Sequence, residues 1–432
     1  MPTRAVAPDR ADAPGRGLLA SRHVSDAELP RIIRLVAARS LNTLGRSVLG
    51  ATVLWELYAR TGEPLVIAGV GLAQVIPVVT LFVPTGALVD RADRRALATA
   101  AATATGLIGL GLAVASASTA PVWLYLALLL GQGCVTAVHA PAVSSLIPLI
   151  IAREQLARAN RISSSLQELA AIIGPAIAGL ALTYVPAGWV YAALAITGLL
   201  AGALYRSLPR PREVTGGADV RKDWRVGLRF IWRSPLLLPA LTLDMFAVLF
   251  AGVTALLPAV ATHVLHTDAL GYGVLRSAQS VGAIAMAMIG GRLPTWQRPG
   301  RVLLIVVALF GAATVGFGLS TSFPLSVALL VVCGALDNVS VVIRLTLEQM
   351  VVPDAIRGRV SAVHYVFIGM SNELGAAESG AAAALLGTVP AIVAGGALAI
   401  VVVGAVAARW RALAAMPPLT QLTPEHGAPP AG

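Results

Sequence analysis

The residues best suited to chemistry are ionisable side chains that interrupt long apolar stretches. Arg39 and Arg46 lie seven residues apart, and Asp337, Arg344 and Glu348 are spaced by seven and four. In a helix of 3.6 residues per turn, these spacings place each set on one face. Such a face can bind an ion or a polar ligand, or pass on a proton.

Other apolar stretches contain His139, Glu168, Asp244 and Glu373. A charged side chain at the centre of a bilayer costs about 2.5 to 3.5 kcal/mol on insertion scales, so we expect these groups to form ion pairs facing protein or water. Two roles stay open, holding helices together or moving a solute or a proton. Glu56, near the end of its stretch, is expected to be a wetted interfacial carboxylate. The predicted substrate or proton pathway comprises Arg39, Arg46, His139, Asp244, Asp337, Arg344 and Glu348.

The composition indicates a membrane protein. Of 432 residues, 57% are hydrophobic and 12% are charged, and the mean hydropathy is +0.79, which is too apolar for a soluble domain. The net charge of +11 arises from basic residues between the apolar stretches, so it does not indicate a nucleic-acid partner. Cys134 and Cys333 lack CxxC spacing, so we predict neither a disulfide nor a metal site.

The apolar stretches predict an all-α membrane protein of twelve transmembrane helices, since a span needs roughly 20 apolar residues. The predicted spans are 32–58, 64–89, 96–117, 122–150, 162–185, 189–204, 236–264, 272–293, 302–319, 324–351, 360–386 and 391–408. The predicted parts are a disordered tail at 1–31, a six-helix bundle at 32–206, a linker at 207–234, a second six-helix bundle at 235–410 and a tail at 411–432. The Pro-rich end from Pro417 is expected to be disordered.

The arginines concentrate in alternate loops, whereas the opposite loops contain only Arg60. Basic loops are retained in the cytoplasm, so we expect both termini to be cytoplasmic and the protein to lie in the inner (plasma) membrane. Trp224, Phe230 and Trp232 stand among basic residues in the linker, which is typical of a segment lying on the inner leaflet.

An offset of 205 residues aligns one half with the other without a gap. It matches Gln74 with Gln279, Pro148 with Pro353 and Glu168 with Glu373. It also places Arg39 opposite Asp244, Gln132 opposite Asp337, and His139 opposite Arg344. Two similar bundles can rock about a site held between them, so the repeat favours a transporter.

The stretch from Gly86 to Arg95, GALVDRADRR, resembles the loop motif between the second and third spans of the major facilitator superfamily. Its glycine permits close helix packing, and its charges can anchor the loop. The stretch from Pro353 to Gly380 is similar to the enterobactin-exporter branch of that family. Residues predicted to act in gating at the cytoplasmic face are Gly86, Asp90, Arg91, Arg94, Arg95, Glu168, Arg357, Arg359 and Glu373.

The resemblance implies alternating access and export of a small molecule such as a siderophore, drug or metabolite, commonly by proton antiport. Uptake or facilitated diffusion on the same scaffold stays open. The sequence contains no HExxH, GxSxG or P-loop motif, so we expect neither an enzyme nor a resident cofactor. The expected partners are a small-molecule substrate, protons and the lipid bilayer, with the chain monomeric. Arginines suit an anionic substrate and aspartates a cationic one, so both substrate classes stay open.

Overall fold

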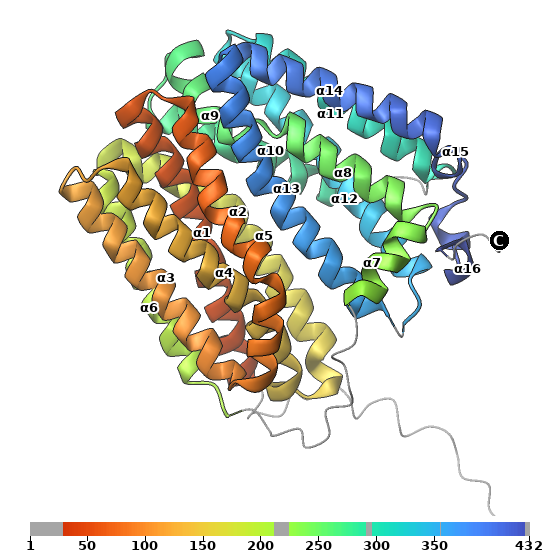
Figure 1. Cartoon of the computed structure of the whole chain (residues 1–432), viewed down its shortest axis with the longest axis horizontal. Coiled ribbons are helices and arrows are strands. Elements are labelled where there is room, and N and C mark those ends of the chain that lie inside the picture. The colour runs from red at the N-terminus through yellow and green to blue at the C-terminus, as the bar shows by residue number, and fades with distance from the viewer. Residues whose placement is uncertain (1–28, 211–223, 291–295, 355, 428–432) are drawn as a thin grey trace, which may run out of the picture.

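The computed structural model describes residues 29–210, 224–290, 296–354 and 356–427. This part of the chain forms two helical bundles, one from each half of the sequence (Figure 1). The N-terminal bundle contains α1 (Leu29–Thr61), α2 (Pro64–Arg91), α3 (Arg94–Ala117), α4 (Val122–Ile150), α5 (Arg153–Tyr184) and α6 (Ala187–Arg206). The C-terminal bundle contains α8 (Leu237–Ala251), α10 (Ala269–Gly290), α11 (Pro299–Leu319), α12 (Phe323–Val351), α13 (Arg357–Leu386) and α14 (Thr388–Arg409).

Nine of the described helical segments are long and apolar enough to cross a membrane. The remaining long helices are α1, α10 and α13, and each contributes a charged residue to the cavity described below. The all-α membrane fold is therefore confirmed.

The chain connections define two ends of the molecule. We call the end that contains the start of α1 and the start of α13 the arginine-rich end, because the basic loops gather there. The other end, formed by the turns after α1, α3, α5, α11 and α13, is called the opposite end.

The seventh predicted span, 236–264, is not one continuous α-helix. After α8 the chain forms η1 (Val253–Ala255), α9 (Leu257–Ala259) and the π-helical turn η2 (Val260–Val264). The break begins at Gly252, which leaves helical geometry with ψ at 80°. Pro258 follows and has no N–H to donate to a continuing helix. The backbone is therefore irregular where the span meets the cavity.

The two halves pack alike, but the offset between them is not uniform. Gly133 of α4 lies against the backbone oxygen of Gln74, and Gly334 of α12 lies against the backbone oxygen of Gln279. The glutamines are 205 positions apart, whereas the glycines are 201 apart. The four extra residues precede α4, because α3 has 24 residues against 21 in α11 and the turn after α3 is one residue longer.

The residue matches that the single 205-residue offset predicted after α3 and α11 are therefore wrong by four residues, or about one helical turn. Gly174 and Gly375 are also 201 apart, and the residues they contact, Ser47 of α1 and Val248 of α8, have the same separation. The shorter offset therefore holds for these helices too, and the match of Arg39 with Asp244 is displaced in the same way. The displaced matches are Gln132 with Asp337, His139 with Arg344, Pro148 with Pro353, and Glu168 with Glu373.

The linker contains the short helix α7 (Trp224–Arg233), which packs on the start of α13 through Gly227. Its Ile231 is buried, while Trp232 is 66% exposed, an amphipathic pattern that fits the predicted interfacial position.

The described part of the C-terminal tail, 411–427, is folded, in contrast to the predicted disorder from Pro417. It forms α15 (Arg411–Ala414), η3 (Leu419–Gln421) and α16 (Pro424–Gly427). Met416 and Leu422 are buried in the same apolar cluster as the end of α12, and Gly427 lies against the backbone of Val351. Burial of these apolar side chains opposes the flexibility that the prolines suggested.

Candidate substrate cavity and ion pairs

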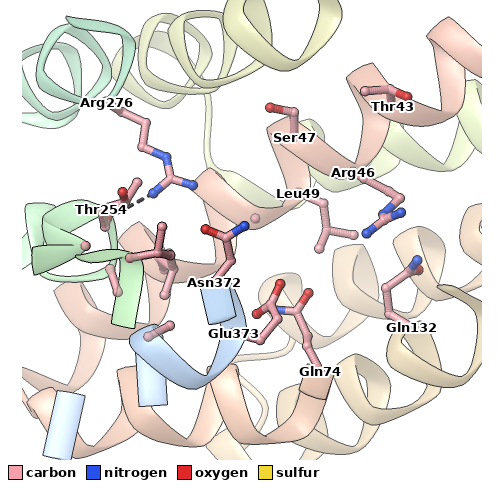
Figure 2. Close-up of a pocket in the computed structure, with 16 residues that line it drawn as sticks. Thr43, Arg46, Ser47, Leu49, Gln74, Gln132, Thr254, Arg276, Asn372 and Glu373 are labelled. Carbon is pink, nitrogen blue, oxygen red and sulfur yellow. Dashed lines mark hydrogen bonds between the residues drawn. The ribbon is translucent and has the colours of Figure 1, made fainter. Parts of the chain in front are cut away.

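A cavity of about 420 Å³ lies between the two bundles, near the middle of α1 and α13. It is within the range of volumes found for small-molecule sites. Both halves line it, with Gln74 and Gln132 from the first and Thr254 and Asn372 from the second (Figure 2). The site therefore belongs to the interface between the halves and to neither bundle alone.

Three charged side chains line this cavity, Arg46 of α1, Arg276 of α10 and Glu373 of α13. Arg46 is exposed to the cavity. Arg276 Nη1 donates a hydrogen bond to the carbonyl oxygen of Thr254 at 2.9 Å (Figure 2). Both guanidinium groups act electrostatically on the carboxylate of Glu373. Glu373, predicted to gate the cytoplasmic face, is thus placed in the central cavity instead.

Small residues and aromatic rings close the opposite end. Gly71 of α2 lies against the backbone of α13, and Gly179 of α5 lies against Gly273 of α10, each too close for a Cβ atom. The rings of Trp55 and Tyr272 stack with centroids 5.0 Å apart, and those of Tyr58 and His263 meet edge to face at 5.8 Å. These contacts join the halves without an ion pair, so they can separate without leaving a buried charge.

The cavity is not fully enclosed. The two bundles contact each other closely at the opposite end, and their helices diverge toward the arginine-rich end in Figure 1.

A second group of predicted residues lies inside the C-terminal bundle. Asp244 of α8 forms an ion pair with Arg344 of α12, and both are buried. Arg344 Nε also donates to Ser340 Oγ at 3.2 Å. Asp337 is exposed and shares a small cavity with Asp244. The structure thus brings together three residues that the sequence placed in one pathway.

Glu348 does not join that group. Its carboxylate oxygens accept a hydrogen bond from Ser361 Oγ and contact His364 Nδ1, both at 2.5 Å, which ties α12 to α13. The remaining ring nitrogen of His364 is buried without a hydrogen-bond partner in the described part of the chain.

Arg39 and His139 gather in the N-terminal bundle, away from the cavity lining. The His139 ring meets Tyr205 edge to face with centroids 5.7 Å apart, and Arg39 acts electrostatically on both rings. Arg46 is therefore the predicted pathway residue from this half that reaches the cavity.

Two of the predicted gating arginines, Arg95 and Arg357, donate hydrogen bonds to backbone carbonyls at the arginine-rich end. Arg95 Nη1 donates to the carbonyl of Leu208 at 2.7 Å, which holds the start of α3 against the end of α6. Arg357 pairs with Asp354 at 2.5 Å. The backbone of Arg359 lies against Gly227 of α7, and the Nε of Arg94 is buried without a partner among the described residues. The side chains of Gly86, Asp90, Arg91 and Glu168 lie outside the described part of the structure.

The sequence prediction missed Arg276, His364 and the burial of Glu56. Arg276 and His364 stand within predicted spans, so their charge was a usable signal. Glu56, predicted to be wetted, is 9% exposed. Its Oε1 atom accepts hydrogen bonds from Ser116 Oγ at 2.7 Å and Tyr125 OH at 3.0 Å. Tertiary contacts of this kind leave no pattern in a single helix.

The family model described as Major Facilitator Superfamily matches residues 35–376. The chain is 26% identical over 374 residues to "Enterobactin exporter EntS" of Shigella boydii serotype 4, covering 83% of this chain and 86% of that protein. It is 27% identical over 375 residues to the protein of that name from Escherichia coli O1:K1, with the same coverage.

Solved structures share the fold. A bacterial homologue of the human lysosomal transporter Spinster, in an inward-facing and occupied conformation, has a TM-score of 0.68 at 14% identity and covers 95% of this chain and 100% of its own. A D-xylose-proton symporter has a TM-score of 0.67 at 11% identity, covering 91% and 98%. The chain is a transporter that belongs to the major facilitator superfamily.

Proposed function

We propose that the protein exports a small molecule from the cytoplasm by alternating access. The observation that supports this most is the polar cavity between the halves, which glycine and aromatic contacts close at the opposite end, while the helices diverge toward the arginine-rich end. If the arginine-rich end is cytoplasmic, as the distribution of arginines predicts, this is an inward-facing state ready to take up a cytoplasmic substrate.

The opposite-end contacts suit a rocking motion. Glycine pairs such as Gly179 with Gly273 allow backbones to meet without interlocking side chains, and no ion pair across this seam is found among the described residues. One buried apolar cluster lies within each bundle, whereas a third cluster joins both halves, so movement of the halves as rigid bodies must separate this shared apolar surface.

Proton coupling is proposed to act through Asp337, Asp244 and Arg344. Asp337 lines a small cavity beside Asp244 and forms no hydrogen bond or ion pair with the described residues, whereas Asp244 is buried against Arg344. Protonation of either carboxylate removes negative charge beside Arg344, which weakens the hold of α12 on α8. That change biases one arrangement of the C-terminal bundle over another, as a two-state switch requires.

The relatives named as enterobactin exporters support an outward direction and a siderophore-like or metabolite-like substrate. Uptake is the second candidate, because the D-xylose-proton symporter has the same fold. Fold likeness does not fix direction.

Metabolite and drug profiling of deletion and overexpression strains tests the proposal. We expect one compound to disappear from the medium of the deletion strain and to accumulate outside the overexpressing strain. Accumulation of the compound inside intact overexpressing cells would contradict export and establish uptake. In proteoliposomes, unchanged pH-driven transport by both Asp244→Asn and Asp337→Asn would refute the coupling.

A further inference from the structure

The charged residues of the central cavity are unequal in number. Two guanidinium groups, Arg46 and Arg276, face a single carboxylate, Glu373, and the described lining contains no other ionisable residue. This lining therefore has an excess of positive charge inside a membrane-embedded interface, where charge is expensive.

The two guanidinium groups have unused hydrogen-bonding capacity. Arg46 forms no hydrogen bond or ion pair with the described residues, although it is exposed to the cavity. Arg276 uses Nη1 on the carbonyl of Thr254 and has further N–H groups available. Guanidinium groups bind carboxylates and related anions through paired, charge-assisted hydrogen bonds.

Glu373 acts as an internal counter-ion that does not satisfy either arginine. Both arginines act on it electrostatically, yet neither forms an ion pair with it among the described contacts. Gln74 and Gln132 add amide groups to the same cavity (Figure 2).

We propose that the cavity selects an organic anion, held between Arg46 of the first half and Arg276 of the second, with Glu373 as the built-in competitor for the same cations. The inference rests on the proposed function, since it takes the cavity as the transport site. A cationic substrate would meet a net positive lining, so the geometry disfavours that class.

The position of the cations links binding to movement. Arg46 lies on α1 and Arg276 on α10, so a bound anion neutralises charge contributed by both halves at once. Repulsion between the two cations falls when the anion is present, which favours approach of the halves around it.

Equilibrium dialysis of the purified full-length protein tests the inference with three probes that share one aromatic body. These are 1-naphthoate, 1-naphthamide and 1-naphthylmethylammonium, an anion, a neutral amide and a cation. We expect naphthoate to bind at least about tenfold more tightly than naphthamide, and the cation to bind most weakly. Equal binding of the three, preference for the cation, or no binding of naphthoate at millimolar concentration would overturn the proposal.

Single-residue variants test whether the preference for naphthoate arises from the charged residues of the cavity. Arg46→Gln and Arg276→Gln are each expected to weaken naphthoate binding about tenfold while leaving naphthamide unchanged. Glu373→Gln removes the competitor and strengthens naphthoate binding several-fold. Arg229→Gln, at an exposed position on α7, is the matched control for net charge. If naphthoate selectivity survives in both arginine variants, the site is wrongly assigned.

Profiling of strains separates this inference from the proposed function. Equal binding of the probes, combined with export of a compound by the strains, would overturn only the anion selectivity. Selective naphthoate binding without export would overturn only the proposed direction of transport.

Discussion

The buried carboxylates of the two halves have different surroundings. In the N-terminal bundle, Glu56 lies near the opposite end and is held by two hydroxyl groups, with Arg60 Nη1 at 3.5 Å. In the C-terminal bundle, Asp244 is paired with a buried arginine, and exposed Asp337 lies beside it. The halves share a fold while their carboxylates differ in position and in partners.

This difference suggests a division of labour. Glu56 is bonded within its own bundle, away from the cavity, so it stabilises one arrangement of α1, α3 and α4. Asp244 pairs with Arg344 between α8 and α12, and the same arginine acts electrostatically on Asp337, so protonation of either aspartate changes the charge balance around Arg344. A fixed N-terminal bundle and a switchable C-terminal bundle are therefore the expectation.

The largest expected effect comes from breaking the buried ion pair. Arg344→Gln leaves Asp244 buried without its cation, and we expect the free energy of unfolding to fall by about 3 to 5 kcal/mol. Thermal melting in detergent measures this loss of stability, and Arg301→Gln, at an exposed position, is the control. The double variant Asp244→Asn/Arg344→Gln should recover much of the loss. Equal melting of Arg344→Gln and wild type would refute the buried pair.

A smaller effect is expected in the N-terminal bundle. Glu56→Gln retains the shape of the side chain but removes the charge that Ser116 and Tyr125 stabilise, so we expect a loss of about 1.5 to 3 kcal/mol. The pH dependence of transport in proteoliposomes should stay unchanged, because this carboxylate is a fixed anchor. A shifted pH profile with normal melting would show that the N-terminal bundle also takes part in the switch.

Asp337→Asn should have the opposite effects, with little change in stability and a loss of pH-driven transport. Since Asp337 forms no hydrogen bond or ion pair with the described residues, this substitution should change stability by no more than about 1 kcal/mol. Transport driven by a pH gradient should fall at least about tenfold, equivalent to about 1.4 kcal/mol. The substrate identified from the strains serves for the assay, and transport down a substrate gradient is the control. Unchanged pH-driven transport would remove Asp337 from the coupling.

The composition and the length of the apolar stretches were sufficient to predict the membrane fold, because a bilayer requires long, internally bonded helices. Spacing within α12 also predicted that its charges share a stripe. The sequence could not predict which residues of the two halves are equivalent after α3, since the extra residues at the end of α3 leave the hydrophobic pattern intact. The partners of Glu56 and Glu348 were equally hidden, because contacts between helices are not encoded in the period of either helix. Folding of the tail depends on burial of Met416 and Leu422 against α12, which opposes the disorder typical of prolines.

Cysteine accessibility tests the central claim that one cavity between the halves opens only toward the arginine-rich end. A Cβ atom at Gly50, which lines the cavity, would meet no atom within 4 Å, so Gly50→Cys can be introduced into a Cys134→Ala/Cys333→Ala background without a clash. Gly404→Cys is the control. Gly404 lies on α14 at an exposed position outside the described cavity lining, and a Cβ atom there would also meet no atom within 4 Å.

We expect a membrane-impermeant maleimide to label Gly50→Cys in inside-out vesicles, to label it far more slowly in right-side-out vesicles, and to leave Gly404→Cys unmodified in both. Faster labelling of Gly50→Cys from the right-side-out surface, or protection from both surfaces, would contradict the account.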